Sequence, residues 1–420
     1  MSGATAVRYP EVVAPRMGRP FAWLLNACAG SNLADGIYQV ALPIAAVHIG
    51  GDASGVAVVT AAARTPWLLF GLFSGVLVDR VDQRRLMWLV SMGRALVLGV
   101  ATALCVTDTA TVPALAAIAF LLGVGETIFD TAFHTTTPQL VPKSLLERAN
   151  ARLQAAEITT NQLLGPPLGG VLLGIAAAFA FGATAVLYAA VTLAVLAIPR
   201  PRRRPTTPQA ARSVRGDLTA GLLFLVRHPS LLIYAIGVGL LNLAWAAVYT
   251  TLPVFALAPG PLGLSSAAYG VVLMLAGVSG LITGLTSAKI ITGLGPRTSP
   301  VLGLTGLALG LGLPGLWPTR LGLAVGLACT GLLILINVVT VTHRQRTVPI
   351  ELLGRVTSAY RLITFGCLPV GSALAGVVGT HFGSRSVLSG AGLLVLATAV
   401  PMVLTTKDPA PATSAAREQP

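Results

Sequence analysis

The stretch GVLVDRVDQRRLM, Gly75 to Met87, crowds five charged residues into seven positions of a chain that is only 10% charged. Long apolar runs stand on both sides of it. Charged side chains are costly inside a bilayer, so the cluster must lie in a short, hydrated turn between two buried segments. Its members are Asp79, Arg80, Asp82, Arg84 and Arg85.

The composition of the whole chain places that turn in a membrane protein. Of its 420 residues, 54% are hydrophobic, and the mean hydropathy is +0.80, whereas soluble domains carry about a quarter charged residues. A helical span needs roughly 20 mostly apolar residues. We therefore predict an all-α membrane protein with twelve transmembrane helices near 21–49, 54–78, 86–107, 112–137, 156–177, 182–199, 231–257, 266–288, 299–317, 321–342, 360–380 and 386–404.

Several other classes of protein are not supported. The first apolar run is too long for a signal-peptide core, so we expect it to be retained as a helix. The four cysteines all fall within apolar runs and show neither a disulfide nor a metal-binding spacing. The sequence lacks a Walker loop, a zinc-ligand spacing and a G-x-S-x-G motif. We expect no enzyme activity, no cofactor and no bound metal.

The distribution of basic residues predicts the orientation. If the N-terminus is cytoplasmic, 24 of the 28 Lys and Arg residues fall on the cytoplasmic side, whereas the outward loops carry only Arg320 and Arg385. This positive-inside bias places both termini in the cytoplasm, and we expect the bacterial inner membrane. Topology therefore accounts for the net charge of +14, and no nucleic-acid partner is expected.

A basic linker and an internal repeat divide the chain into two halves. The segment PRPRRRPTTPQAARSVRGDL has the composition of a linker, and LTAGLLFLVRHPSL after it is amphipathic and too short to span, which is typical of a surface helix. VPKSLLERANARLQ (141–154) matches VPIELLGRVTSAYR (348–361) at an offset of 207. The expected units are a cytoplasmic segment 1–20, a six-helix bundle 21–199, a linker with its amphipathic helix 200–230, a second bundle 231–404 and a cytoplasmic disordered tail 405–420.

The opening stretch resembles the signature loop of the major facilitator superfamily, which joins spans two and three. Gly75 stands at that motif's small residue, Asp79 and Arg80 at its acidic–basic pair, and Arg84 and Arg85 at its closing basic residues. Asp82 replaces the usual second glycine. The resemblance implies two pseudo-symmetric six-helix bundles with the substrate site between them, and a gating role for the loop. Plain positive-inside topology is the alternative explanation of its charges.

NQLLGPPLGG, Asn161 to Gly170, resembles the antiporter motif in span five of proton-coupled exporters. The matching residues are Gly165, Pro166, Gly169 and Gly170, whereas Asn161 replaces the leading glycine. A kinked helix with no exporter role is the alternative. Nearly the whole chain resembles the branch that includes enterobactin exporters and macrolide-efflux-like proteins. The Arg expected in span four of many drug–proton antiporters is Glu126 here, which argues against a simple transfer of their mechanism.

Ionisable residues within spans are functional candidates because their burial is costly. Glu126, Asp130 and His134 share one face of span four, with His134 expected to be an interfacial residue rather than a relay. Matching depths at about 1.5 Å per residue predicts two ion pairs, Asp35–Arg64 and Asp130–Arg94, which could also be purely structural. Glu126 has no depth-matched cation, so it is the first candidate for the proton-coupling group, followed by Asp35 and Asp130.

Polar and aromatic residues predict where the substrate binds. Asn32 and Gln39 lie with Asp35 on roughly one face of span one, and Asn242, Trp245 and Tyr249 share a face of span seven, while Asn337 lies in span ten. An aromatic surface suits an amphiphilic organic compound, although Trp245 and Tyr249 could equally be packing residues.

The sequence thus predicts a secondary transporter that exports a small hydrophobic or amphiphilic compound, such as an antibiotic or siderophore, in exchange for protons. We expect a monomer whose partners are the substrate, protons and the lipid bilayer. The alternatives are an uptake symporter or uniporter, and a membrane sensor or scaffold that transports nothing.

Overall fold

The computed structural model describes residues 17–50, 53–142, 145–199 and 214–405, and these form helices with no β-strand among them. The first half contains α1 (Arg19–Gly50), α2 (Ala53–Arg80), α3 (Gln83–Val106), α4 (Val112–Leu140), α5 (Leu146–Glu157), the π-helix η2 (Ile158–Leu164), α6 (Gly165–Ile175) and α7 (Ala177–Leu196). After it come α8 (Val214–Arg227), α9 (Pro229–Ala256), α10 (Ser266–Leu316), α11 (Arg320–Thr330), α12 (Leu333–Thr347), α13 (Ile350–Phe382) and α14 (Ser384–Thr405).

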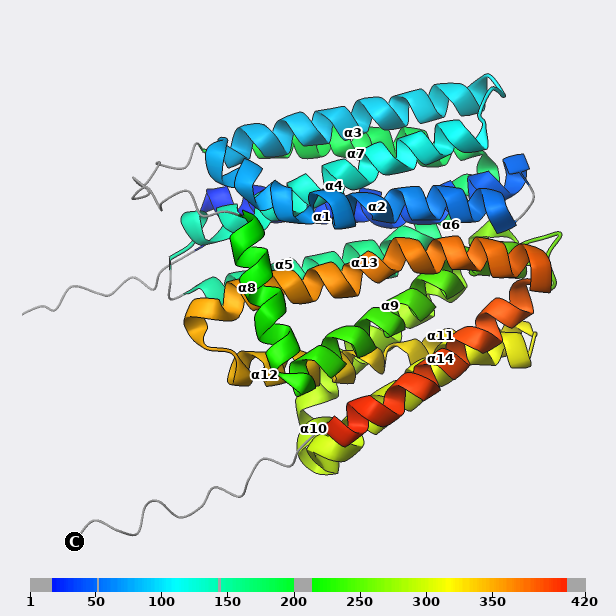
Figure 1. Ribbon diagram of the computed structural model, residues 1–420. Coiled ribbons are helices and arrows are strands. Elements are labelled where there is room, and N and C mark those ends of the chain that lie inside the picture. The colour runs from blue at the N-terminus through cyan, green and yellow to red at the C-terminus, as the bar shows by residue number, and fades with distance from the viewer. Residues whose placement is uncertain (1–16, 51–52, 143–144, 200–213, 406–420) are drawn as a thin grey trace, which may run out of the picture.

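These helices form two bundles of six spans each, α1–α7 and α9–α14, which lie one above the other in Figure 1. Helices α5, η2 and α6 follow one another as the fifth span, α10 supplies two spans that meet at Gly295 (φ 82°), and α11 and α12 together make the tenth. The predicted all-α membrane fold is confirmed.

Within the described residues, ten helical segments are long and apolar enough to cross a membrane. Two predicted spans, 21–49 and 156–177, are not among these ten, and each has a local structural reason. Helix α1 carries a row of polar residues, and the fifth span is divided into three short helices. Large apolar side chains point outward around the bundle, for example Leu96, Val186 and Leu285, which are 64%, 70% and 77% exposed. A bilayer would cover such a surface.

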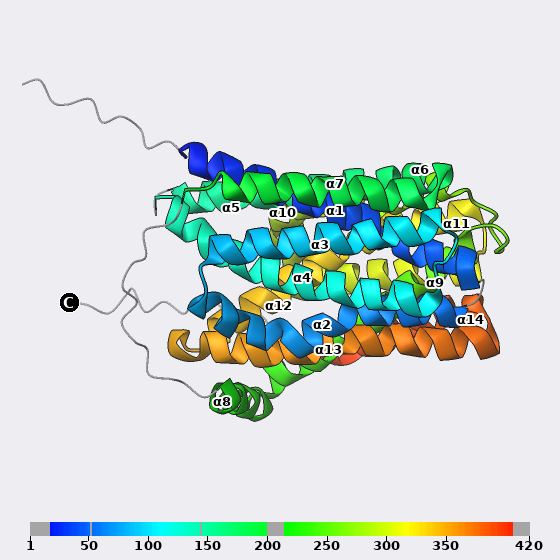
Figure 2. The ribbon, with the colours of Figure 1, turned by 90° about the horizontal axis from the view of Figure 1, so that it is seen from above.

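Helix α8 crosses the other helices near the end of the bundle where α1 begins and α14 ends (Figure 1), and Figure 2 shows it end-on outside α13. We call this end of the bundle the inner end. Helix α8 packs on α13, where Gly221 lies directly against the main chain at Arg355. Leu223 and Val226 are exposed, as expected of a helix lying along a membrane surface. The rest of the expected linker, 200–213, and most of both predicted terminal segments (1–16 and 406–420) lie outside the described residues.

The two halves meet along two pairs of helices, α2 with α13 and α6 with α10. Gly170 lies against the main chain of Ser266, and Gly376 lies against Ala57, so neither position has room for a side chain. Close contacts of this kind between small residues are a common way for helices to associate in membranes. Helices α9 and η2 add further contacts between the halves, and these surround the central cavity.

Candidate substrate cavity and coupling network

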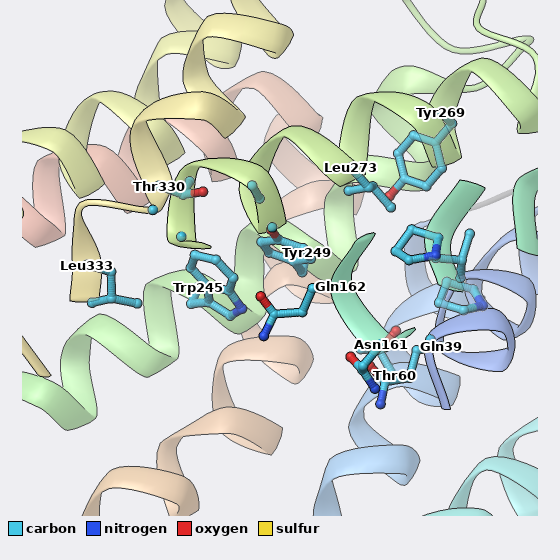
Figure 3. Close-up of a pocket in the computed structure, with 18 of the residues that line it drawn as sticks. Gln39, Thr60, Asn161, Gln162, Trp245, Tyr249, Tyr269, Leu273, Thr330 and Leu333 are labelled. Carbon is cyan, nitrogen blue, oxygen red and sulfur yellow. The ribbon is translucent and has the colours of Figure 1, made fainter. Parts of the chain in front are cut away.

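A cavity of about 390 Å³ lies between the two halves (Figure 3). Its lining comes from α1, α2, η2 and α6 of the first half and from α9, α10, α11 and α12 of the second. The chain is irregular at two places along this lining, η2 in span five and the turn between α11 and α12 in span ten. Irregular backbone at membrane depth is tolerated where it lines a cavity, and substrate sites of helical transporters are typically built from such interrupted helices.

Two aromatic side chains of α9 form one wall. The rings of Trp245 and Tyr249 are stacked, with centroids 4.4 Å apart and planes 20° apart. Gln162 lies beside this pair, and Asn161, Gln39 and Thr60 lie together on the other side of the view in Figure 3. The cavity therefore offers a flat apolar surface on one side and several polar groups around it.

Four of the six residues expected in the cavity line it: Gln39, Trp245, Tyr249 and Asn337. The other two do not. The Asn242 amide donates to the main-chain oxygen of Thr364 at 3.0 Å, so it links α9 to α13 within the second half. Asn32 lies two helical turns from Gln39 along α1, about 10 Å nearer the inner end, where it lines a different cavity.

The two prolines that come after η2 in the sequence explain its π-helical hydrogen bonding. Pro166 and Pro167 have no N–H, so the Gln162 carbonyl finds no donor four or five residues ahead. The Gly165 N–H bonds five residues back, to Thr160 O, which is the π-helical pattern. Gly36 of α1 and Gly277 of α10 lie against the carbonyls of Asn161 and Gln162, respectively. Asn161 and Gln162 were not predicted as lining residues, although the double proline indicated an irregular helix.

The span-five motif packs on one side against α1 of its own half and on the other side against α10 of the second half. Gly165 lies against Gly36 of α1, and Gly169 lies against the main chain of Ile37. On its other side, Pro166 meets Gly270 of α10, close to the contact that Gly170 makes with the same helix. Span five is thus held between α1 and the second half, and a movement of α1 has a direct mechanical route to the junction between the halves.

The charged groups of the first half pair differently from the prediction. Arg94 of α3 forms an ion pair with Asp35 of α1, and both are almost fully buried, at 2% and 4% exposure. The predicted pairs Asp130–Arg94 and Asp35–Arg64 are wrong. Depth along a span does not tell which helix faces meet, and the long arginine side chain reaches well away from its own Cα. Gly125 of α4 makes room for the Arg94 side chain.

Two tyrosines complete this network, and neither was predicted. The Tyr188 hydroxyl donates to Asp35 Oδ1 at 2.5 Å, and the Arg94 guanidinium lies 4.2 Å from the Tyr188 ring centre. The Tyr38 hydroxyl donates to Glu126 Oε2 at 2.8 Å and accepts from Arg94 Nη2 at 3.4 Å. Tyr38 thereby connects Glu126 to the Asp35–Arg94 pair. The sequence offered one indication of this role for Tyr38, namely that it lies one helical turn from Asp35 on the same helix.

Part of the Arg94 guanidinium has no partner. Its Nε and Nη1 atoms are buried without a hydrogen bond among the described residues. A buried donor left unsatisfied is costly, so these two nitrogens leave the network with fewer acceptors than the Arg94 guanidinium can use. This marks it as a place where the hydrogen-bond arrangement can change.

Asp130 and His134 line a second cavity, of about 450 Å³, together with Asn32 and Glu157. This cavity belongs to the first half alone and is formed by α1, α4 and α5. It lies towards the inner end, one helical turn beyond Glu126 along α4. Its lining has two carboxylates and no Lys or Arg within the described part of the chain.

The charged turn between α2 and α3 is described in part. Asp82 caps α3, because its Oδ1 accepts from the main-chain N–H of Arg85 at 3.0 Å. Arg84 donates from Nε to Val195 O at 3.3 Å and from Nη2 to Leu196 O, at the C-terminal end of α7 where a cation is favourable. Arg85 is exposed. Gly75, Asp79 and Arg80 belong to α2, but their side chains lie outside the described residues.

Two six-helix bundles around a central cavity are the architecture of the major facilitator fold. The chain belongs to the MFS_3 family, described as transmembrane secretion effectors, whose family profile matches residues 11–419. The predicted superfamily is thereby confirmed, and the protein is a membrane transporter of this type. The resemblance to enterobactin-exporter and macrolide-efflux-like proteins stays a prediction.

Relatives agree with this assignment. The uncharacterized MFS-type transporter YfiS of Bacillus subtilis is 26% identical over 379 residues, which cover 86% of this chain and 87% of that protein. The uncharacterized MFS-type transporter y4rN of Sinorhizobium fredii is 27% identical over 275 residues, covering 64% of this chain and 66% of that protein.

Solved structures show the same fold at low identity. The nucleoside transporter NupG has a TM-score of 0.70 and 14% identity, covering 93% of this chain and 100% of that one. A bacterial homologue of the iron transporter ferroportin in an inward-facing state has a TM-score of 0.72 and 17% identity, covering 93% and 99%. At such identities the likeness concerns the fold alone.

Proposed function

We propose that this transporter exports a small hydrophobic or amphiphilic compound, such as an antibiotic, a siderophore or another secondary metabolite, in exchange for protons. It would act as a monomer in the bacterial cytoplasmic membrane with both termini in the cytoplasm. One observation carries the proposal: a buried network of titratable groups lies next to the central cavity but outside its lining. Such groups are costly inside a membrane and are a usual sign of proton or ion coupling.

Glu126 is the first candidate for the proton carrier. While its carboxylate is ionised, it accepts the Tyr38 hydroxyl hydrogen. Once protonated, it can donate a hydrogen itself, and the Tyr38 hydroxyl hydrogen is then free to turn elsewhere. Protonation of Glu126 would therefore rearrange the hydrogen bonds around Arg94, whose donors are incompletely used.

Asp130 and Asp35 take secondary roles in this scheme. Asp130 lines the inner cavity one turn from Glu126 and would pass the proton towards the cytoplasm. Asp35 is held by Arg94 and Tyr188, so it would respond to the carrier rather than carry the proton itself. Arg94 is its ion-pair partner, whereas Arg64 lies in the central cavity.

Helix α1 would transmit the change to the substrate. One of its faces holds Asp35 and Tyr38, while Gly36 and Gln39 on another face line the cavity. Span five, with its glycines on α1 and on α10, would carry the movement to the second half. Coupling would then be indirect, because proton and substrate occupy separate sites. The turn at Asp79 and Arg80 would act as a latch at the inner end, with Arg84 fastening α3 to α7.

The test is transport by the purified protein in vesicles, with and without an imposed pH gradient and membrane potential. A membrane potential of 100 mV supplies about 2.3 kcal/mol per charge, so a permanently neutral carrier should forfeit this force. We expect Glu126→Gln to allow downhill exchange and to abolish uphill export. Asp108→Asn is the matched control, since Asp108 is exposed outside the network. Uphill export by Glu126→Gln at the wild-type rate would exclude Glu126 as the coupling group.

A further inference from the structure

The central cavity has an unbalanced charge. Arg64 of α2 is the charged residue among its described lining, and no Asp or Glu lines it. Arg64 forms no ion pair with any residue that the structure describes. The nearby carboxylates are engaged elsewhere: Asp35 with Arg94, and Glu126 with the Tyr38 hydroxyl. Glu126 is close enough to interact with Arg64 electrostatically, yet it lies outside the cavity lining.

By itself, the aromatic wall would favour a positively charged substrate, which Arg64 repels. Stacked faces such as Trp245 and Tyr249 attract cations through their ring quadrupoles. A guanidinium without an ion-pair partner on the same cavity repels cations, and the low dielectric of the surroundings strengthens that repulsion. At equal distance, a full positive charge repels a cation more strongly than a ring quadrupole attracts it.

The shape and the polar groups narrow the substrate further. A volume of about 390 Å³ accommodates two or three fused rings. A flat ring can stack on Trp245 and Tyr249, as aromatic pairs in proteins do. Arg64 donates hydrogen bonds and accepts none, so it requires an acceptor such as a carbonyl, an enolate or a carboxylate. The amides of Gln39, Gln162 and Asn337 can bind further polar groups on the same molecule.

We propose that the central cavity selects flat aromatic compounds that carry a hydrogen-bond-accepting edge and no positive charge, with Arg64 binding that edge and the Trp245–Tyr249 pair stacking on the ring. The proposal rests on the proposed function in one respect, that this cavity is where the substrate binds. It does not depend on protons or on the direction of transport. Arg64 disfavours lipophilic cations, which aromatic cavities often bind.

Binding of three probes with one ring system and three charges tests this selectivity. The probes are 2-naphthoate, 2-naphthamide and 2-naphthylmethylammonium, titrated into the purified full-length protein by calorimetry. Quenching of Trp fluorescence gives a second readout, with the signal of Trp245 identified by its loss in Trp245→Phe. We expect the naphthoate and the naphthamide to bind, and the ammonium to bind at least about tenfold more weakly, which unit charges in a cavity of low dielectric readily produce.

Variants at Arg64 test whether its charge causes this order of probe binding. Arg64→Gln should weaken naphthoate binding about tenfold, strengthen ammonium binding and change naphthamide binding less than about threefold. Arg64→Lys retains the charge and should retain the order of the probes, which separates charge from folding. Arg361→Gln is the matched control, because Arg361 borders a small separate cavity between α2, α4 and α13.

Three results would overturn the proposal. They are equal binding of ammonium and naphthoate to the wild type, an unchanged order in Arg64→Gln, or no binding of any probe. None of these measurements needs a gradient, so loss of proton coupling in the transport assay would leave the selectivity intact. Conversely, a transported cation would refute the selectivity while leaving proton-coupled export in place.

Discussion

The two halves of this transporter hold their first helices in chemically different ways. In the first half, α1 is tied to its neighbours by the Arg94–Asp35 pair and by the Tyr38–Glu126 bond. In the second half, α9 is tied to α13 by neutral groups, Asn242 to Thr364 and Thr250 to Ser372, each at 3.0 Å. The first half thus fixes its first helix with charged groups, whereas the second half, which repeats the same fold, uses amides and hydroxyls.

The difference extends along the sequence. Between Asp217 and Asp408 the chain has a single carboxylate side chain, Glu351 at the start of α13. At the repeat offset of 207, Asp130 of the first half corresponds to Asn337 of the second. An amide has nearly the shape of a carboxylate and cannot take up a proton in the physiological range. Protonation of a carboxylate can therefore change the interior of the first half, whereas the cavity wall that the second half supplies has no Asp, Glu or His among its described residues.

The largest expected effect comes from breaking the charged side of this comparison. Arg94→Met leaves Asp35 buried without its partner, and loss of one member of a buried ion pair typically costs about 3–5 kcal/mol. Asn242→Ala in the second half removes one neutral hydrogen bond, worth about 1 kcal/mol. Thermal unfolding of the purified variants in detergent should show a much larger loss for Arg94→Met.

The double variant Arg94→Met with Asp35→Asn separates charge from packing. It removes both charges, so it should recover most of the stability that Arg94→Met loses. Equal stability of Arg94→Met and the wild type would mean that Asp35 is already neutral in the folded protein, and that the pair has no part in holding α1.

The second prediction gives the second half a carboxylate within a membrane span, which is a feature of the first half. Asn337→Asp places a carboxylate on the wall of the central cavity, opposing the charge of Arg64. Binding of 2-naphthylmethylammonium should strengthen about tenfold and should weaken as the pH falls, because the introduced carboxylate loses its charge when it takes up a proton. Calorimetry at two pH values measures both effects. The neutral variant Asn337→Ser should leave ammonium binding weak, and strong binding by it would implicate cavity size rather than charge.

The sequence was sufficient for the spans and insufficient for the pairing of charges. Runs of apolar residues determine where helices cross a membrane, and the matching segments after Pro142 and Pro349 indicate two similar bundles. Position along a span follows from residue spacing, but an ion pair also needs two helix faces to meet. Those faces depend on packing, such as the space that Gly125 leaves for Arg94, which a single sequence does not display.

The candidate site was predictable where chemistry alone marks a residue. Glu126 and Asp130 are conspicuous because carboxylates are rare in apolar helices. Tyr38 and Tyr188 were missed because an uncharged tyrosine does not stand out in an apolar helix as a carboxylate does, and its role here comes only from the partner of its hydroxyl. Asn242 was misplaced because an amide suits a cavity wall and a helix contact equally well. Its partner, a main-chain carbonyl of α13, leaves no mark in the sequence.

The smallest expected effect concerns the equivalent turns of the two halves, after spans two and eight. In the first half, Asp82 caps α3 with its side chain. In the second half, the turn relies on Gly295, whose φ of 82° suits glycine and few other residues. Asp82→Ala should cost about 1 kcal/mol, whereas Asp82→Asn should cost little, because Asn caps helices about as well as Asp. Gly295→Ala should cost about 1–3 kcal/mol through backbone strain.

These three variants distinguish a structural turn from a gating one. If Asp82 acts only as a cap, Asp82→Asn retains both the unfolding temperature and the transport rate, since the cap needs an oxygen and not a charge. If the charge of Asp82 also takes part in gating, the unfolding temperature is retained and transport falls. Gly295→Ala provides the reference, because strain in a turn without a carboxylate should lower the unfolding temperature by a few degrees at most and leave coupling to protons unchanged. A transport loss in Gly295→Ala as large as that in Asp82→Asn would mean that both turns gate the cycle, and that the two halves differ in their buried interiors but not at their inner ends.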